Sequence, residues 1–308
     1  MMFRIGVQTG GIQSFSSIDE TYRMIKEAGF DAADANIDEV FMPEDIEHRK
    51  ISSVFVDEKT CLEAVKPYRD AARKYGIDNY QCHAPFPSLV YEEEGSAYND
   101  YLIEVLKKTI ACCDYIDCRN LVIHPFENRY AHYLSEQQNM EVNMDRYSRL
   151  IDKAKEYGVT ICLENICSTY RGKTYTGCCG TMDEACSYVD ELNRLAGEKR
   201  FAFCLDTGHL TVCSQPIKRA IVTLGDRLAA LHVHDNNGID DLHYMPYTGI
   251  VDWDRFVEGL AEIHFDRTLC FETFRSYEVV DPSLRMIVLQ YVCQAGRAFA
   301  QRASLLEK

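Results

Sequence analysis

Short apolar runs rich in β-branched residues alternate with longer segments of helical periodicity, and this alternation occurs eight times along the chain. The runs predict strands at residues 3–8, 31–37, 79–85, 120–125, 159–165, 201–210, 229–235 and 268–274. The segments between and after them predict helices at about 17–28, 58–75, 98–117, 135–157, 181–196, 214–225, 252–263 and 283–305. Gly29, Gly76 and Gly158 follow three of these segments, as glycine often follows the last turn of a helix.

Several of the predicted strands are continuously apolar rather than alternating, which is typical of parallel strands buried on both faces. Eight strand–helix repeats in 308 residues indicate the α/β class and a (β/α)8 TIM barrel. An open doubly wound sheet is the alternative, but its G-x-G-x-x-G dinucleotide fingerprint is absent. We find no linker rich in Pro, Gly or Ser, so a single domain over residues 1–308 is expected.

Residues that can bind metal or move protons stand at the ends of the predicted strands. They are His83, His124, Glu164, Asp206, His232 and Glu272. The carboxyl ends of barrel strands converge on one mouth, where active sites of this architecture lie. A single histidine at a strand end is more often structural, but six such residues on one rim indicate a functional site.

The stretch 231–253 is also rich in histidine and acidic residues. It contains His232, His234, Asp240, Asp241 and His243 ahead of the only tryptophan. A solvated polar loop and a metal site are both compatible with the stretch alone. Buried carboxylates repel one another unless a cation lies among them, which favours the metal.

The last four strands offer three carboxylates and one imidazole, from Glu164, Asp206, His232 and Glu272. This mixed oxygen and nitrogen set suits manganese, magnesium, cobalt or zinc, so the identity of the divalent metal stays open.

At these residues the chain resembles the xylose isomerase-like TIM barrel superfamily, which includes sugar isomerases, ketose 3-epimerases of the D-tagatose 3-epimerase type and endonuclease IV. The epimerase branch implies that Glu164, Asp206, His232 and Glu272 hold the metal, with the two glutamates as the catalytic acid/base pair. His209, in a D-x-x-H motif after the sixth strand, is implied to contact substrate.

The seventh-strand signature of the superfamily is also present. It matches His232, Asp235, Asn236, Asp241, His243, Pro246 and residues 249–253, whereas Tyr247 and Thr248 replace the usual glycine and acidic residue.

The resemblance implies a metal-dependent sugar or sugar-phosphate isomerase or epimerase, which abstracts a proton next to a carbonyl through a metal-stabilised enediolate. Two alternatives stay open: an endonuclease IV-like zinc phosphodiesterase and a polyol or keto-inositol dehydratase. The positions that match the nine ligands of endonuclease IV all hold suitable residues: His83, His124, Glu164, Asp206, His209, His232, Asp241, His243 and Glu272.

The net charge of the chain restricts the kinds of partner that we expect. The chain has 33 basic and 48 acidic residues, a formal net charge of -15, which disfavours nucleic acids and anionic membranes. No apolar run of about 18 residues and no signal-peptide core are present, so we expect a cytoplasmic protein. The expected partner is a small sugar or sugar phosphate, with a homodimer left open.

Substrate contacts are harder to assign. His209 and His234 are expected on the substrate side, and Asp34 and Asn36 at the second strand end face the mouth if the barrel is right. Arg275, after the last strand, meets either a phosphate or sugar hydroxyl, or a neighbouring acid. The long segment after residue 36 is either a lid or a peripheral insertion, with Phe41 and Met42 as its apolar tip.

Overall fold

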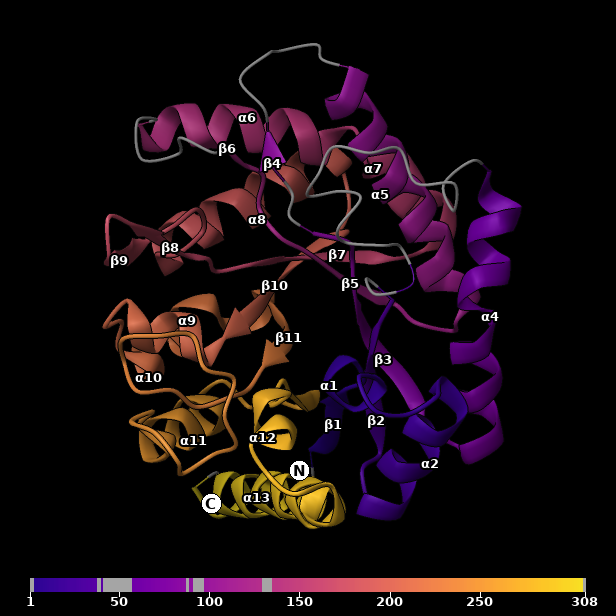
Figure 1. Cartoon of the computed structure of the whole chain (residues 1–308). Coiled ribbons are helices and arrows are strands. Elements are labelled where there is room, and N and C mark those ends of the chain that lie inside the picture. Colours follow the sequence, from indigo (N-terminus) through magenta and orange to yellow (C-terminus); the bar gives the residue numbers. More distant parts are fainter. Residues whose placement is uncertain are drawn as a thin grey trace.

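Eight parallel strands form the barrel that the sequence predicts. The computed structural model describes residues 3–37, 40, 57–86, 89–90, 97–128 and 135–306. The barrel strands are β1 (Arg4–Gln8), β2 (Ala32–Asn36), β3 (Asp78–His83), β5 (Asn120–Ile123), β7 (Thr160–Glu164), β10 (Phe201–Asp206), β11 (Leu228–His232) and β12 (Thr268–Phe271). They are ordered β11-β10-β7-β5-β3-β2-β1-β12. A parallel bridge between Val233 and Phe271 joins the two ends of this order, which closes the (β/α)8 TIM barrel (Figure 1).

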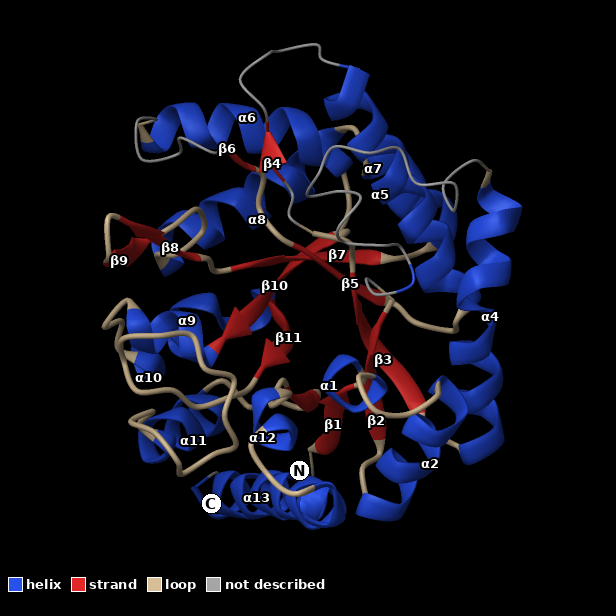
Figure 2. Ribbon diagram, in the orientation of Figure 1, coloured by secondary structure: helices blue, strands red, loops and turns tan. Residues whose placement is uncertain are grey.

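Helices surround the ring of strands (Figure 2). The longer ones are α2 (Ile18–Ala28), α4 (Glu58–Tyr75), α5 (Ala97–Tyr115), α6 (Glu136–Ser148), α7 (Ile151–Tyr157), α8 (Met182–Ala196), α10 (Ile217–Leu224), α11 (Trp253–Glu262) and α13 (Arg285–Leu306). Three short helices, α1 (Gly10–Gln13), α9 (Thr207–Val212) and α12 (Arg275–Glu278), are the next elements after strands β1, β10 and β12, at the mouth. Within the described residues, none of the helices combines the length and apolar character that a membrane crossing needs.

The small residues that fill the barrel interior show in which direction the strand-end acids point. A separate cluster of small buried residues comprises Val122, Cys162, Ala202, Cys204, Ala229 and Ala230. Side chains two residues apart in a strand share a face, so Cys162 and Glu164 point the same way, as do Cys204 and Asp206. The strand-end acids are therefore the next layer of inward-facing side chains above this small-residue layer.

Helix α13 closes the barrel from outside and brings the end of the chain against its beginning. Arg297 pairs with Asp31 at 2.7 Å, which ties α13 to the start of β2. At Gly296 an added Cβ would lie 2.7 Å from both Ile5 Cγ2 and Phe271 Cε2. Glycine at this position therefore lets the helix approach β1 and β12 closely.

The helix predicted at 135–157 is instead two helices, α6 and α7, separated at Arg149 and Leu150. The amide of Leu150 donates to Tyr147 O, three residues back, at 3.0 Å, so the backbone tightens locally. Tyr147 and Leu150 are both fully buried, and the tyrosine hydroxyl donates to Ile123 O at 2.9 Å. Tertiary packing thus ends α6 where periodicity alone predicts continuation.

Two pairs of short strands were not predicted. Strand β4 (Leu89–Val90) pairs with β6 (Glu127–Asn128), and β8 (Cys167–Tyr170) forms an antiparallel hairpin with β9 (Lys173–Thr176). Both pairs follow the carboxyl ends of barrel strands and so lie on the mouth side. The proposed lid residues Phe41 and Met42 fall outside the described residues.

Candidate metal centre at the barrel mouth

The four residues expected to hold a metal meet at the mouth. Glu164, Asp206 and His232 end strands β7, β10 and β11, and Glu272 directly follows β12. All four are buried, with exposed fractions of 1%, 0%, 1% and 7%. His232 Nδ1 lies 3.0 Å from Glu164 Oε1 and 3.5 Å from Glu272 Oε2, so one nitrogen of the imidazole faces both glutamates.

A second set of predicted residues surrounds this group. His124 Nε2 lies 3.2 Å from Glu164 Oε2 and 3.1 Å from His83 Nε2. On the other side Asp241 Oδ2 lies 2.8 Å from His243 Nε2 and 3.3 Å from His209 Nε2.

Most of these residues line one cavity of about 430 Å³. Of the nine positions that match endonuclease IV, seven line this cavity: His83, His124, Glu164, His209, Asp241, His243 and Glu272. The structure therefore brings these predicted site residues together from the carboxyl ends of β3, β5, β7 and β12, from α9 and from the loop after β11.

Asp206 is oriented by its own local structure. Its side chain caps α9 by accepting from His209 N at 2.7 Å, which fixes the carboxylate at the start of the helix. The side-chain oxygen of Asn165 accepts a hydrogen bond from Asp206 N at 2.8 Å, and its side-chain amide donates one to Asp206 O at 2.9 Å. Asn165 was not singled out from the sequence, although its place directly after a strand-end acid could have drawn attention to it.

His234 is placed differently from the other histidines. It is fully buried, and its Nε2 lies 3.0 and 2.9 Å from the two carboxylate oxygens of Asp206. An added Cβ on Gly208 would lie 1.9 Å from His234 Cε1, so the ring packs directly on the α9 backbone. His234 is absent from the described lining of the cavity, and its assignment to substrate stays a prediction.

Arg275, the other predicted substrate contact, begins α12 with an exposed side chain and is also absent from that lining. Its role in binding a phosphate or sugar hydroxyl likewise stays a prediction.

The loop after β11 is held by Asp235, which was matched to a motif but given no role. Its Oδ1 accepts from Asn236 N and Val251 N at 3.0 and 3.1 Å, and its Oδ2 accepts from Trp253 Nε1 at 3.1 Å. An added Cβ on Gly249 would lie 2.1 Å from Asn236 O, so glycine is needed where the two ends of the loop meet. The aspartate therefore joins both ends of the segment that carries Asp241 and His243.

A model of the xylose isomerase-like TIM barrel family matches residues 22–289, which is most of the chain. The chain belongs to this family.

Individual relatives match over shorter lengths. An uncharacterised protein of Methanocaldococcus jannaschii is 25% identical over 194 residues, which are 62% of either chain. An L-ribulose 3-epimerase of Methylomonas sp. strain DH-1 is 29% identical over 150 residues, 49% of this chain and 47% of the relative. The chain thus spans less than two thirds of these curated relatives.

Solved structures agree over the whole fold. A D-tagatose 3-epimerase-like protein superimposes with a TM-score of 0.72 at 18% identity and covers 97% of this chain and 98% of its own. The IOLI protein with a bound zinc atom superimposes with a TM-score of 0.67 at 17% identity, covering 99% of each chain. At these identities the likeness establishes the shared barrel.

Electrostatics at the mouth of this family member fit a cation. Burial alone would raise the pKa of Glu164, but the charges of His232 and His124 lower it well below its usual range. Burial alone would lower the pKa of His234, but Asp206 raises it to about 9. Within the described residues, the ion pairs of Glu164, Asp206, Asp241 and Glu272 are all with histidines. Histidines therefore face carboxylates whose charge a divalent cation could balance.

Two carboxylate oxygens provide the more direct test of fit. Glu164 Oε2 and Asp241 Oδ1 are buried, and no described residue donates a well-aligned hydrogen bond to either. Buried carboxylate oxygens without donors are costly unless a cation or water meets them. Together with the oxygen and nitrogen donor set, these atoms suit a divalent metal.

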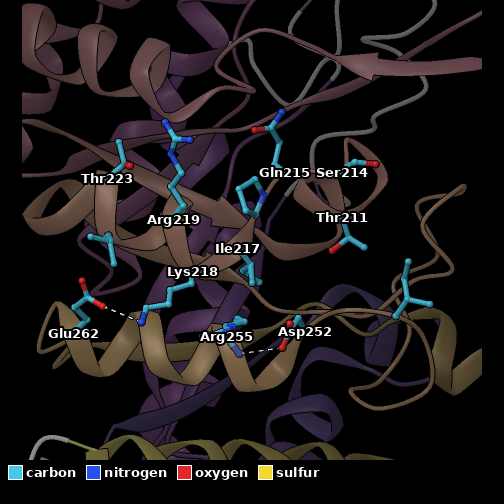
Figure 3. Close-up of a pocket in the computed structure, with 13 residues that line it drawn as sticks. Thr211, Ser214, Gln215, Ile217, Lys218, Arg219, Thr223, Asp252, Arg255 and Glu262 are labelled. Atoms are coloured by element: carbon cyan, nitrogen blue, oxygen red, sulfur yellow. Dashed lines mark hydrogen bonds and ion pairs between the residues drawn. The ribbon is translucent and has the colours of Figure 1, made fainter.

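A larger cavity of about 700 Å³ lies outside the barrel, between the α9–α10 segment and α11. Figure 3 shows Lys218 of α10 extending toward Glu262 of α11, at 3.1 Å. Arg255 is paired with Glu258 at 2.7 Å. The charged side chains of this larger cavity thus largely pair with one another. Those at the barrel mouth instead converge on one shared space. We therefore place the candidate site in the smaller cavity.

Proposed function

We propose that this chain is a divalent-metal-dependent ketose 3-epimerase. The observation that carries the proposal is that Glu164 and Glu272 both line the mouth cavity and both lie close to His232 Nδ1, at 3.0 and 3.5 Å. The relatives named as epimerases and the epimerase-like barrel support it.

Epimerisation beside a ketone removes a proton from one face of a carbon and returns one to the other face. Two acid/base groups are therefore needed on opposite sides of the substrate. Glu164 and Glu272 come from strands β7 and β12, which are separated by β10 and β11 in the barrel order, so they approach the cavity from different directions. We assign one glutamate to each face.

The metal would be held by Glu164, Asp206, His232 and Glu272. When bound there, a divalent cation supplies Lewis acidity to the substrate oxygens next to the reacting carbon.

Neighbouring residues prepare the glutamates and the cavity. Gln8 donates its amide to Glu272 Oε1 at 2.6 Å, which leaves Oε2 directed at the cavity. His209 donates Nδ1–H to Asn165 O at 2.8 Å, because a carbonyl can only accept, and its Nε2 then faces Asp241 and the substrate space. His209 is thereby oriented to contact a substrate oxygen.

A three-zinc phosphodiesterase is the second candidate, and one observation favours it. His83 donates Nδ1–H to Ala84 O at 2.7 Å, which leaves Nε2 facing His124 and Glu164 as a ligand would. Metal analysis separates the candidates, since one ion per chain supports the epimerase and close to three zinc ions support the phosphodiesterase. The net charge of -15 argues against a nucleic-acid substrate.

The decisive experiment follows a carbon-bound proton. The manganese-loaded protein is incubated in D2O with D-fructose, D-tagatose or L-ribulose, and NMR is expected to show deuterium at C3 together with the C3 epimer. Glu272→Gln should abolish formation of the C3 epimer, whereas Glu262→Gln, on the surface of α11, should leave both epimer formation and deuterium incorporation unchanged. Continued formation of the C3 epimer by Glu272→Gln contradicts the assignment, and a product lighter by one water indicates a dehydratase.

A further inference from the structure

The first three strands contribute none of the four proposed ligands, yet two of them place polar side chains at the centre of the barrel. Asp34 of β2 and Gln81 of β3 are both fully buried. Gln81 Nε2 donates to Asp34 Oδ2 at 2.8 Å and contacts Leu231 O at 3.2 Å. Buried polar groups are usually hydrogen-bonded, because leaving them without partners is costly. A buried carboxylate such as that of Asp34 is therefore expected to have a further hydrogen-bond donor besides Gln81.

That partner is His232. Asp34 Oδ2 lies 3.1 Å from His232 Nε2, on the ring edge that faces away from Glu164 and Glu272. The other ring nitrogen, Nδ1, faces those two glutamates. The two nitrogens of one imidazole are thus divided between the mouth cavity and the buried carboxylate.

This division determines which nitrogen can bind a cation. An ionised carboxylate only accepts hydrogen bonds, so contact with Asp34 keeps a proton on Nε2. Nδ1 is then the nitrogen whose lone pair can face the cavity. Histidines that bind metals commonly donate their second N–H to a carboxylate in this way, which fixes both tautomer and ring orientation.

We propose that Asp34 is a positioning residue that presents His232 Nδ1 to the metal, and that Gln81 holds Asp34 in place. The proposal rests on the proposed function in that it assumes a metal at the mouth. Its physical basis is the chain of contacts from Gln81 to Asp34 to His232, which crosses the barrel interior from β3 to β11.

Asp34→Asn and Asp34→Leu separate the charge from the hydrogen bond, because the first removes only the charge and the second also removes the acceptor. Chelator competition with Zn²⁺ on the metal-free protein should show affinity about 10-fold weaker for Asp34→Asn and up to about 100-fold weaker for Asp34→Leu. Gln81→Leu should weaken affinity in the same direction but less. Asp31→Asn, at the opposite end of β2 and bonded to Arg297, is the control. It should lower thermal stability without changing zinc affinity.

A spectroscopic readout distinguishes positioning from general stability. In zinc-loaded protein labelled with 15N-histidine, wild-type His232 should carry its proton on Nε2, and this proton should exchange slowly with water. In Asp34→Leu the proton should exchange faster, while Asp31→Asn should match wild type.

Each outcome bears on a separate claim. Unchanged zinc affinity and unchanged Nε2–H exchange in the Asp34 variants overturn the positioning role, even if ketoses are epimerised. If the Asp34 variants do not fold, wild-type affinity in Gln81→Leu overturns it. Weakened zinc binding in a protein that turns over no ketose supports the positioning role and refutes the proposed function alone.

Discussion

Asp235 is expected to be the residue on which the structure of the loop after β11 depends most. Asp235→Asn keeps the size of the side chain and can keep an oxygen for the amides of Asn236 and Val251, at 3.0 and 3.1 Å. The new amide group then faces Trp253 Nε1–H, 3.1 Å from the lost oxygen, so two donors meet in a fully buried place. A hydrogen bond to a charged acceptor contributes about 1.5–3 kcal/mol, and a buried unsatisfied donor costs about 1–3 kcal/mol.

We therefore expect Asp235→Asn to lower the free energy of unfolding by about 2–4 kcal/mol, measured by urea denaturation of the metal-free protein. Asp240→Asn, exposed in the same loop, should stay within about 0.5 kcal/mol of wild type. Trp253→Phe removes the opposing donor, so the double variant should be more stable than the sum of the single changes by about 1–2 kcal/mol. A fully additive cycle, or a fully stable Asp235→Asn, would refute this account of the loop.

Three further changes test other parts of the structure. Asn165→Ala removes both hydrogen bonds to the backbone of Asp206 and should weaken metal binding several-fold in a chelator titration, with a loss of about 2 kcal/mol in unfolding free energy. Gly296→Val should lower the melting temperature by several degrees in calorimetry, since its Cβ would lie 2.7 Å from side chains of β1 and β12. Burial raises the pKa of Glu184 to about 7 from 4.5, so the folded state keeps a proton that the unfolded state loses first. Wild type should therefore lose stability relative to Glu184→Gln as pH rises from about 5 to 8, by at most about 3 kcal/mol, seen in melting temperatures across that range.

The barrel and the layer of acidic side chains at its mouth could be predicted from the sequence because both follow from local periodicity. Strand side chains alternate, so an acid two residues after a small buried residue, as Glu164 follows Cys162, must point into the barrel. The parallel topology then brings all the strand ends to one mouth. No longer-range information is needed for either step.

The supporting contacts could not be predicted, because they depend on distances across the barrel. Asp34 was expected to face the mouth, but its contact with His232 joins residues 198 positions apart. Gln8 and Gln81 resemble ordinary polar residues of strands, and only the radius and tilt of the barrel determine that they reach Glu272 and Asp34. The break between α6 and α7 has a similar origin, since it follows from packing against the barrel.

Two parts of the barrel thus contribute different groups to the mouth. Substitutions in these two parts should therefore have different effects on metal binding. Strands β7 to β12 supply groups that would touch the metal, so replacing one of them removes a ligand outright. Strands β1 to β3 supply Gln8, Asp34 and Gln81, which act through Glu272 and His232, so their replacement should produce graded effects. Substitutions in the first three strands should therefore tune metal affinity and the orientation of the glutamates while leaving the reaction type unchanged.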